Sequence, residues 1–244
     1  MSLPLDDSTI FLTLQTGEAQ LQGQFVRGSN YTFLVDVTLG ETKLTAVYKP
    51  VRGEQPLWDF PPNSLCKREV AAYLVSQALG WGLVPPTLYR RRKLPLGAGS
   101  LQYFVDHKPS YHFFNFTPAD RARLRPTAVF DLLINNADRK GGHILVGSEG
   151  HIWLIDHGVC FHVEDKLRTV VWDFALEPIP EELLSAMAAL LPRLTPEGDL
   201  LIALKPYLRL SEIKALRRRA QALLDHPIFP AQPTDRRAFP WPPV

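Results

Sequence analysis

Strand-like runs dominate the first half of the chain. Residues 23–27, 31–39 and 42–48 are rich in aromatic and β-branched side chains, and residues 28–30, Gly-Ser-Asn, have the composition of a turn. We therefore predict a hairpin from the first two runs. The third run is predicted to be a strand that ends at Lys49.

Helical spacing takes over in the second half of the chain. A first helix is predicted earlier, over residues 65–79, where apolar side chains recur at helical intervals and two glycines follow. A β-rich first part and a helical second part indicate an α+β protein with two lobes. The other predicted elements are strands over 88–91, 101–105, 144–146 and 152–155, and helices over 118–123, 127–136, 181–191, 198–204 and 211–224.

Composition narrows the class of protein. Hydrophobic residues make up 45% of the chain, and 27 Lys and Arg stand against 25 Asp and Glu, so the formal net charge is only +2. A nucleic-acid-binding protein would be more basic, and we expect no nucleic-acid partner. The chain has no apolar run of the roughly 18 residues that a membrane-spanning helix needs, and its first residues do not resemble a signal peptide. We expect no integral membrane association and a cytoplasmic location.

Two aspartates stand on either side of a short predicted hairpin. Asp138 lies in the polar loop 135–143, Asn-Asn-Ala-Asp-Arg-Lys-Gly-Gly-His, and Asp156 follows an apolar strand. Phosphoryl transfer needs a carboxylate near the attacking group, which Asp138 could supply. Mg²⁺ prefers oxygen ligands, and Asp156 on a sharp turn before Gly158 is a candidate ligand.

Lys49 and Glu69 complete the pattern. A lysine at the end of a strand can hold a phosphate, and Glu69 in the next helix could pair with it. Taken singly, each residue has a simpler explanation: a solvated lysine, a glutamate that favours the helix dipole, a surface ion pair at Asp138, a turn at Asp156. Their order along the chain is what indicates a phosphotransfer site.

In these residues the chain resembles the phosphatidylinositol 3-/4-kinase superfamily. It is most similar to the type II phosphatidylinositol 4-kinases and to a bacterial phosphatidylinositol-kinase-like family of unknown function. The resemblance implies a bilobal, protein-kinase-like α+β fold, with an N-lobe over 1–106, a C-lobe over 107–230 and a Pro-rich tail over 231–244. It covers about residues 23 to 184 and is best over 46–50, 68–86, 102–106, 136–143 and 155–161.

The resemblance also implies ATP and Mg²⁺ as cofactors and assigns the site residues. Lys49 would hold the phosphates with Glu69 orienting it, Asp138 would position or deprotonate the acceptor, and Asp156 would bind the metal. The turn with Ser29 and Asn30 would face the phosphates. An inter-lobe hinge would hold adenine through Gln102, Phe104, Val105 and Asp106.

The chain departs from the family pattern at His143, where the family has a metal-binding asparagine five residues after the catalytic-loop aspartate. Imidazole is a poor ligand for Mg²⁺ and an acceptable one for Mn²⁺, so Mn²⁺ is an alternative metal. Lys166 and Arg168 follow Asp156 and suggest an anionic acceptor. The cysteine-rich insert of the lipid enzymes is absent, which argues against a lipid substrate.

Three functions are compatible with this sequence. The first is an ATP-dependent phosphotransferase acting on an unidentified acceptor, a protein or an anionic small molecule. The second is a pseudokinase that binds nucleotide and regulates other proteins, which His143 would favour. The third is a kinase-fold enzyme that transfers AMP. The helical segments after about residue 180 suggest packing and no chemistry.

Overall fold

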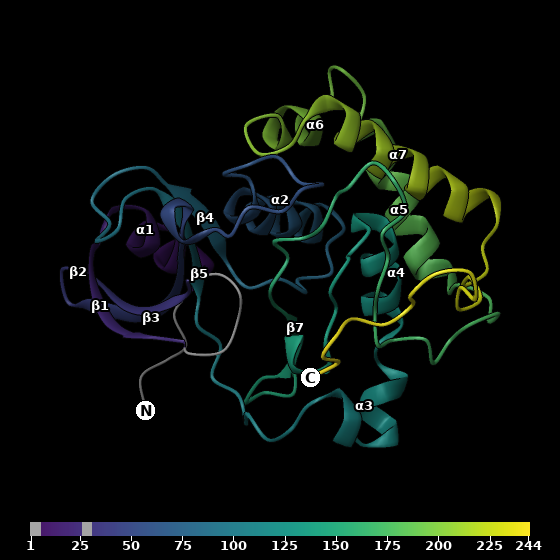
Figure 1. The fold of residues 1–244 in the computed structure, drawn as a ribbon, viewed down its shortest axis with the longest axis horizontal. Helices are drawn as coiled ribbons and strands as arrows, with labels where there is room; N and C mark the ends of the chain where they lie inside the picture. The colour runs from purple at the N-terminus through teal and green to yellow at the C-terminus, as the bar shows by residue number, and fades with distance from the viewer. Residues whose placement is uncertain (1–5, 26–30) are drawn as a thin grey trace.

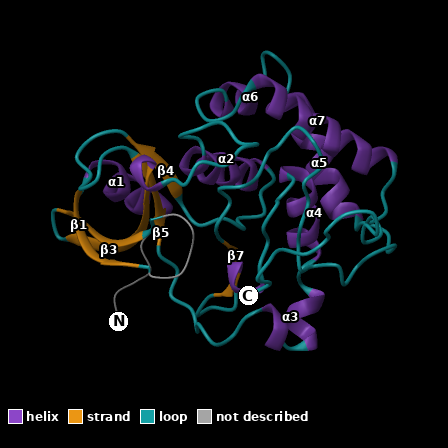
Figure 2. Ribbon diagram, in the orientation of Figure 1, coloured by secondary structure: helices purple, strands orange, loops and turns teal. Residues whose placement is uncertain are grey.

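The protein has two lobes of different composition in the computed structural model, which describes residues 6–25 and 31–244. One lobe is built mainly from strands and the other mainly from helices, as Figures 1 and 2 show. The expected bilobal α+β, kinase-like fold is confirmed. The predicted turn at residues 28–30 lies outside the described residues.

A five-stranded antiparallel sheet forms most of the first lobe, with strand order β1-β2-β3-β5-β4. Alternate residues of the central strand β3 are buried, namely Leu44, Ala46 and Tyr48, because one face of the sheet packs on a small core. β1 pairs with β2 in an antiparallel hairpin, but β1 ends at Gln24 and lies mostly before the predicted run 23–27, whereas β2 falls within the predicted run 31–39. The strands are β1 Glu18–Gln24, β2 Phe33–Leu39, β3 Thr42–Pro50, β4 Thr87–Arg90 and β5 Gly99–Tyr103.

Helix α1, Asp7–Thr16, covers that face of the sheet and was not predicted from the sequence. The side chain of Asp6 accepts a hydrogen bond from the Thr9 amide and so caps the helix. Ile10 and Leu14, four positions apart, are buried in the cluster under the sheet. The cap and this spacing were the signals available in the sequence.

Helix α2, Leu65–Ala78, lies between the sheet and the helices of the second lobe (Figure 1). It contacts β4 and β5 on one side and α6 on the other. Helices buried on most sides usually lack charges, yet Arg68 and Glu69 are both buried here. Glu69 belongs to the site described below, whereas Arg68 pairs with Glu212 of the second lobe.

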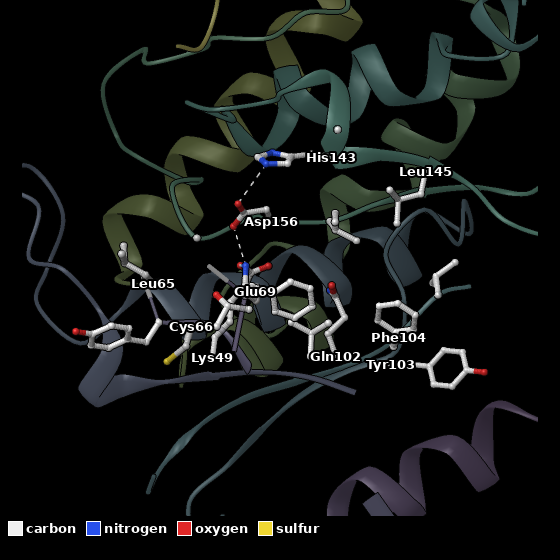
Figure 3. Close-up of a pocket in the computed structure, with 18 of the residues that line it drawn as sticks. Lys49, Leu65, Cys66, Glu69, Gln102, Tyr103, Phe104, His143, Leu145 and Asp156 are labelled. Atoms are coloured by element: carbon white, nitrogen blue, oxygen red, sulfur yellow. Dashed lines mark hydrogen bonds and ion pairs between the residues drawn. The ribbon is translucent and has the colours of Figure 1, made fainter. Parts of the chain in front are cut away.

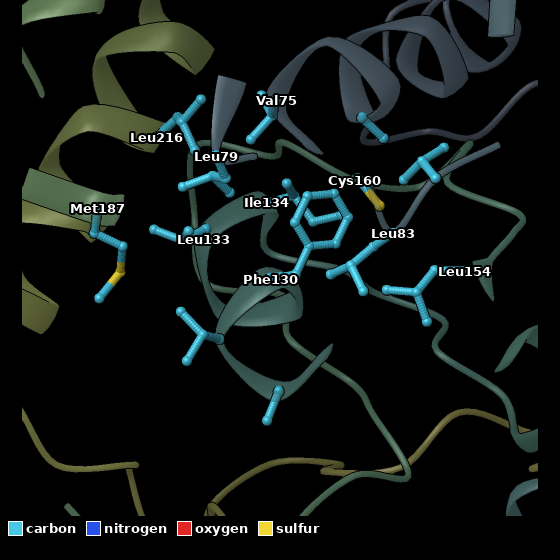
Figure 4. Close-up of a cluster of buried hydrophobic side chains, with 14 of the residues drawn as sticks. Val75, Leu79, Leu83, Phe130, Leu133, Ile134, Leu154, Cys160, Met187 and Leu216 are labelled. Atoms are coloured by element: carbon cyan, nitrogen blue, oxygen red, sulfur yellow. The ribbon is translucent and has the colours of Figure 1, made fainter. Parts of the chain in front are cut away.

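The larger hydrophobic core joins α2 to the helices of the second lobe. Figure 4 shows Val75 of α2 and Leu79, just after the end of α2, in one cluster with Phe130, Leu133 and Met187. The predicted helices are all present. A short hairpin of β6 and β7 lies on the side of the second lobe that faces the first lobe. The bounds are α3 Pro118–Ala122, α4 Arg125–Ile134, β6 Ile144–Val146, β7 Ile152–Leu154, α5 Glu181–Arg193, α6 Asp199–Leu204 and α7 Leu210–Asp225.

Candidate active site

A cavity of about 300 Å³ lies between the lobes. Its walls come from β3, α2, the segment after β5, and the two loops on either side of the β6–β7 hairpin. Figure 3 shows Asp156 between His143 on one side and Lys49 with Glu69 on the other. Residues 107 positions apart in the chain, Lys49 and Asp156, thus meet in one hydrogen bond.

Lys49 is held by two carboxylates. Its ammonium pairs with Glu69 Oε1, and it donates to Asp156 Oδ1 at 2.7 Å. Burial opposes the charge on Lys49, but the two carboxylates outweigh it and raise its pKa. Burial likewise opposes ionisation of Asp156, yet the charge and the hydrogen bond of Lys49 hold its pKa below the ordinary value. The cavity therefore contains a permanent cation beside a permanent carboxylate.

Glu69 is fixed from two directions. Its Oε2 accepts from the backbone amide of His157 at 2.8 Å, while Lys49 occupies Oε1. Burial works against its ionisation, and Lys49 with His157 still lowers its pKa. Glu69 therefore ties helix α2 to the turn that carries Asp156.

Asp156 lies on a sharp turn immediately after β7. Its φ is +60°, in the left-handed region that few side chains other than Asn and Asp adopt readily. This conformation lets Oδ1 meet Lys49 while Oδ2 lies 3.4 Å from His143 Nε2. Nearly half of the Asp156 side chain is exposed, so a bound molecule can reach the carboxylate.

His143 lies between Asp138 and Asp156. Its Nδ1 is 3.1 Å from the carbonyl oxygen of Asp138 and 3.5 Å from the amide nitrogen of Lys140, so the contacts of Nδ1 are compatible with either neutral tautomer. Burial lowers the His143 pKa to about 4, so the ring is neutral at pH 7. In the tautomer with the proton on Nδ1, bonded to the Asp138 carbonyl, Nε2 and Asp156 Oδ2 are two acceptors that face each other.

Such a pair of acceptors fits a divalent cation. A histidine whose Nδ1–H bonds a carbonyl is the usual arrangement of a metal-binding imidazole. Within residues 6–25 and 31–244, three or more His, Cys, Asp or Glu side chains do not gather into a ready metal site. Asp156 and His143 could therefore hold a cation only in part, with other ligands coming from a bound phosphate or water.

Asp138 lies in the loop between α4 and β6. Its carboxylate is 3.5 Å from the Lys140 ammonium, and about one third of its side chain is exposed. Burial raises the Asp138 pKa to about 6, since the attraction of Lys140 offsets only part of the desolvation and Asp156 adds repulsion. A carboxyl with a pKa near neutrality can accept a proton from a substrate hydroxyl.

Beneath the Asp138 loop lies a buried ionic cluster that the sequence did not predict. Arg139 is fully buried and pairs with Asp131, Nη2 to Oδ1 at 3.0 Å. Arg139 also donates to the carbonyl of Ile155 at 2.8 Å and lies 2.9 Å from His157 Nε2. It thus joins the loop of Asp138 to the turn of Asp156. The sequence indicated a surface ion pair between Asp138 and Arg139. In the structure Arg139 is buried and pairs instead with Asp131 of α4.

The segment after β5 lines the opposite end of the cavity. Gln102, Phe104 and Val105 line it, whereas Asp106 is exposed and does not. The Phe104 amide donates to Thr45 O at 3.0 Å. The Val105 amide makes no backbone hydrogen bond within the described chain, so it is free for a ligand.

The two basic residues after Asp156 differ. The Lys166 ammonium lies 3.4 Å from Asp59 and over the Trp58 ring, so its charge is already partnered. The Arg168 guanidinium makes no hydrogen bond or ion pair with any described residue, and its charge acts on Asp138. The other two predicted contacts, Ser29 and Asn30, lie outside the described residues.

Known proteins resemble the chain in sequence. Protein Rv2133c of Mycobacterium tuberculosis is 45% identical over 94% of this chain and 93% of its own length. Phosphatidylinositol 4-kinase gamma 4 of rice is 30% identical over 67% of this chain. The chain spans about a third of that plant kinase, 35% of its length.

Solved structures show the same fold at low identity. The Golgi casein kinase with Mn/ADP bound superposes with a TM-score of 0.60 at 14% identity, covering 90% of this chain and 75% of that one. The Helicobacter pylori proinflammatory kinase CtkA gives a TM-score of 0.54 at 13% identity, covering 88% of this chain and 94% of that one. The model of the family described as phosphatidylinositol 3- and 4-kinase matches residues 60–216. The chain belongs to the phosphatidylinositol 3- and 4-kinase family.

Proposed function

We propose that this kinase-like protein is an ATP-dependent phosphotransferase that moves the γ-phosphoryl group to a hydroxyl of an unidentified acceptor. The observation that carries the proposal is the position of Lys49, whose ammonium bridges Glu69 and Asp156 in the inter-lobe cavity. The Lys49 ammonium would contact the phosphate oxygens of ATP in the place where Glu69 and Asp156 already hold it.

Nucleotide would bind across the cavity. Adenine would accept a hydrogen bond from the free Val105 amide, with Phe104 and Gln102 beside it. The phosphates would extend to Lys49. A divalent cation held by Asp156 and His143 would neutralise charge on the phosphate oxygens.

Asp138 would act at the acceptor. Its carboxylate would accept the proton of the attacking hydroxyl as the new oxygen–phosphorus bond forms. The bond to the β-phosphate oxygen then breaks, and ADP leaves. Arg168, unpartnered and close enough to influence Asp138, supports an anionic acceptor. Lys166 is already paired and supports it less.

A thermal-shift titration with ATP and Mg²⁺ or Mn²⁺, followed by product analysis on the same samples, tests the proposal. We expect metal-dependent stabilisation and ADP formation. Lys49→Met should lose the stabilisation, whereas Asp138→Asn should keep it and lose ADP formation. The absence of nucleotide-dependent stabilisation in the unaltered protein would overturn the proposal, and AMP as the product would redirect it to AMP transfer.

A nucleotide-binding pseudokinase is the second candidate. The observation that favours it is the imidazole of His143 at the place where the family carries asparagine. Stabilisation by metal and ATP without ADP or AMP, including after addition of candidate protein and small-molecule acceptors, would support this alternative. Turnover with Mn²⁺ alone would exclude it.

A further inference from the structure

The proline-rich end of the chain reaches the loop that carries Asp138. The backbone amide of Gly141, three positions after Asp138, donates to the carbonyl of Pro243 at 2.7 Å. In Figure 1 the last residues accordingly lie near β7, far in sequence from the loop they touch. We name residues 236–243 the tail strap.

The tail strap also holds the segment that follows Asp156. The amide of Thr169 donates to Ala238 O at 3.1 Å, and the Trp172 indole donates to the same carbonyl at 3.4 Å. Arg236 donates to Leu167 O at 2.7 Å and pairs with a nearby carboxylate, that of Asp165, at the same distance. Ala238 is 5% exposed, so the contact is a packed one.

Three backbone segments thus lie side by side. The loop of Asp138 bonds the segment of Thr169 directly, since the Arg139 amide donates to Arg168 O at 3.0 Å and the Val170 amide to Arg139 O at 3.2 Å. The tail strap bonds both of the others. Asp138 lies on one of the two segments that the tail strap bonds, and the unpartnered Arg168 lies on the other.

The composition of the tail strap suits it to accept hydrogen bonds from the two other segments. Proline has no amide proton, so a segment with three prolines offers carbonyl acceptors and few donors. Gly141 and Thr169 are buried and need such acceptors, because leaving a buried amide unpaired destabilises the fold. Gly141 is also closed on another side, where a Cβ atom would lie 2.8 Å from the Phe114 ring.

The strap leaves the nucleotide cavity open. Within the described chain, none of residues 236–243 lines that cavity. Its contacts are with the Asp138 loop and with the segment 165–172, where the proposed function places the acceptor. This placement favours a supporting role over a blocking one.

We propose that the tail strap is a positioning element, which holds the Asp138 loop and the 165–172 segment in the arrangement that transfer requires. The proposal rests on the proposed phosphotransferase function. Because Gly141 opens the short turn Gly141–His143, the strap also fixes the place of His143, a candidate metal ligand. Displacing it should therefore weaken metal-dependent nucleotide binding as well as turnover.

Arg236→Ala and Ala238→Glu in the full chain test this inference. The first removes the bonds to Leu167 and Asp165, and the second places a charged side chain in a buried position. Arg237→Ala is the matched control, since the Arg237 guanidinium lies over the exposed Trp241 ring. Three readouts apply: amide hydrogen exchange at Gly141 and Thr169, the affinity for ATP with and without Mn²⁺, and ADP formation.

We expect faster exchange at both amides, and a loss of at least about threefold in Mn²⁺-dependent ATP affinity or ADP formation, since small displacements in a site lower rates strongly. ATP affinity without metal should change little in both variants, and the melting temperature should change little in Arg236→Ala. Arg236→Lys should recover part of the loss.

Faster exchange with unchanged affinity and ADP formation would overturn the inference, as would faster ADP formation, which indicates a blocking tail. Unchanged exchange in both variants would also overturn it. A lack of nucleotide binding in the unaltered protein would instead overturn the proposed function, on which this inference rests.

Discussion

Asp138 and Asp156 carry the same side chain and differ in how the protein treats their charge. Burial raises the Asp138 pKa to about 6, since its lysine partner is 3.5 Å away. Asp156 also lies in a desolvated site, yet Lys49 at 2.7 Å lowers its pKa. Two carboxyl groups with such different pKa values suit separate roles: Asp138 as a base that accepts a proton, and Asp156 as a metal ligand that stays ionised.

The Asp138 pKa gives a pH prediction. If Asp138 must be ionised to accept a proton, ADP formation should rise with pH through about 6 and level off above it. Asp138→Asn should lower the plateau by about 10²-fold or more and remove this rise, consistent with the usual size of general base catalysis. Initial rates between pH 5 and 8 would measure it. A wild-type rate independent of pH over this range would exclude Asp138 as the base.

We expect His143 to influence the metal preference. Replacing it with asparagine exchanges a neutral nitrogen ligand for an amide oxygen, which Mg²⁺ prefers. His143→Asn should therefore raise activity with Mg²⁺ relative to Mn²⁺. His151→Asn is the matched control, because His151 bonds the Gly82 carbonyl and does not line the cavity. An unchanged ratio of the two metal activities in His143→Asn would show that His143 is structural.

Helix α2 is the element that connects the two lobes to the site. Glu69 points to the cavity, while the preceding residue, Arg68, points to the second lobe and bonds Glu212 of α7 at 2.5 Å. Arg68 also donates to Cys160 O. Because α2 is tied at both residues, Glu69 meets Lys49 in the protein without any ligand.

The Arg68–Glu212 pair supports a stability prediction. Both side chains are buried, so Glu212→Ala leaves an uncompensated buried charge and should cost about 3–5 kcal/mol of unfolding free energy. Chemical denaturation would measure this loss. Arg217→Ala, an exposed charge on the same helix, is the control and should cost little.

Replacing the whole pair separates charge from packing. The double variant Arg68→Met with Glu212→Leu should recover much of the lost stability, because it removes both buried charges together. If Glu212→Ala alone leaves the unfolding free energy within about 0.5 kcal/mol of the unaltered protein, the pair contributes as little as a surface contact.

The molecule as a whole has two hydrophobic cores of unequal size with the site between them. The smaller lies under the sheet with α1, and the larger joins α2 to the helical lobe. The cavity is lined from both sides, so ionic contacts such as Lys49 with Asp156 connect the lobes. No helix in the described part of the chain combines the length and the apolar character needed to cross a bilayer.

These inter-lobe pairs predict an acid-sensitive fold. The pKa values of Glu69 and Asp156 are lowered on folding, so their stabilisation is present above the unfolded-state values near about 4 and is lost as pH falls through the lowered values. Melting temperatures between pH 3 and 7 should fall on the acid side, and less steeply in Asp156→Asn. The exposed Asp235→Asn is the control. Identical slopes in all three proteins would contradict the prediction.

The sequence by itself determined the elements and the order of the site residues. Strands and helices followed from local spacing, since a buried face of a strand or helix repeats at a fixed interval. Lys49, Glu69, Asp138 and Asp156 could be proposed because each stands at the end of, or at the start of, a recognisable element. Helix α1 was not predicted because only two of its buried residues, Ile10 and Leu14, are apolar, and together they form a short pattern.

Only the tertiary structure decided which charges meet. The burial of Arg139, the pairing of Arg68 with Glu212 across 144 positions and the bond from Gly141 to Pro243 have no local signal, because they join segments distant in the sequence. The pKa of Asp138 likewise depends on desolvation by neighbours that the fold assembles. Local spacing encodes which face of an element is buried, whereas long-range packing sets what each polar group finds there.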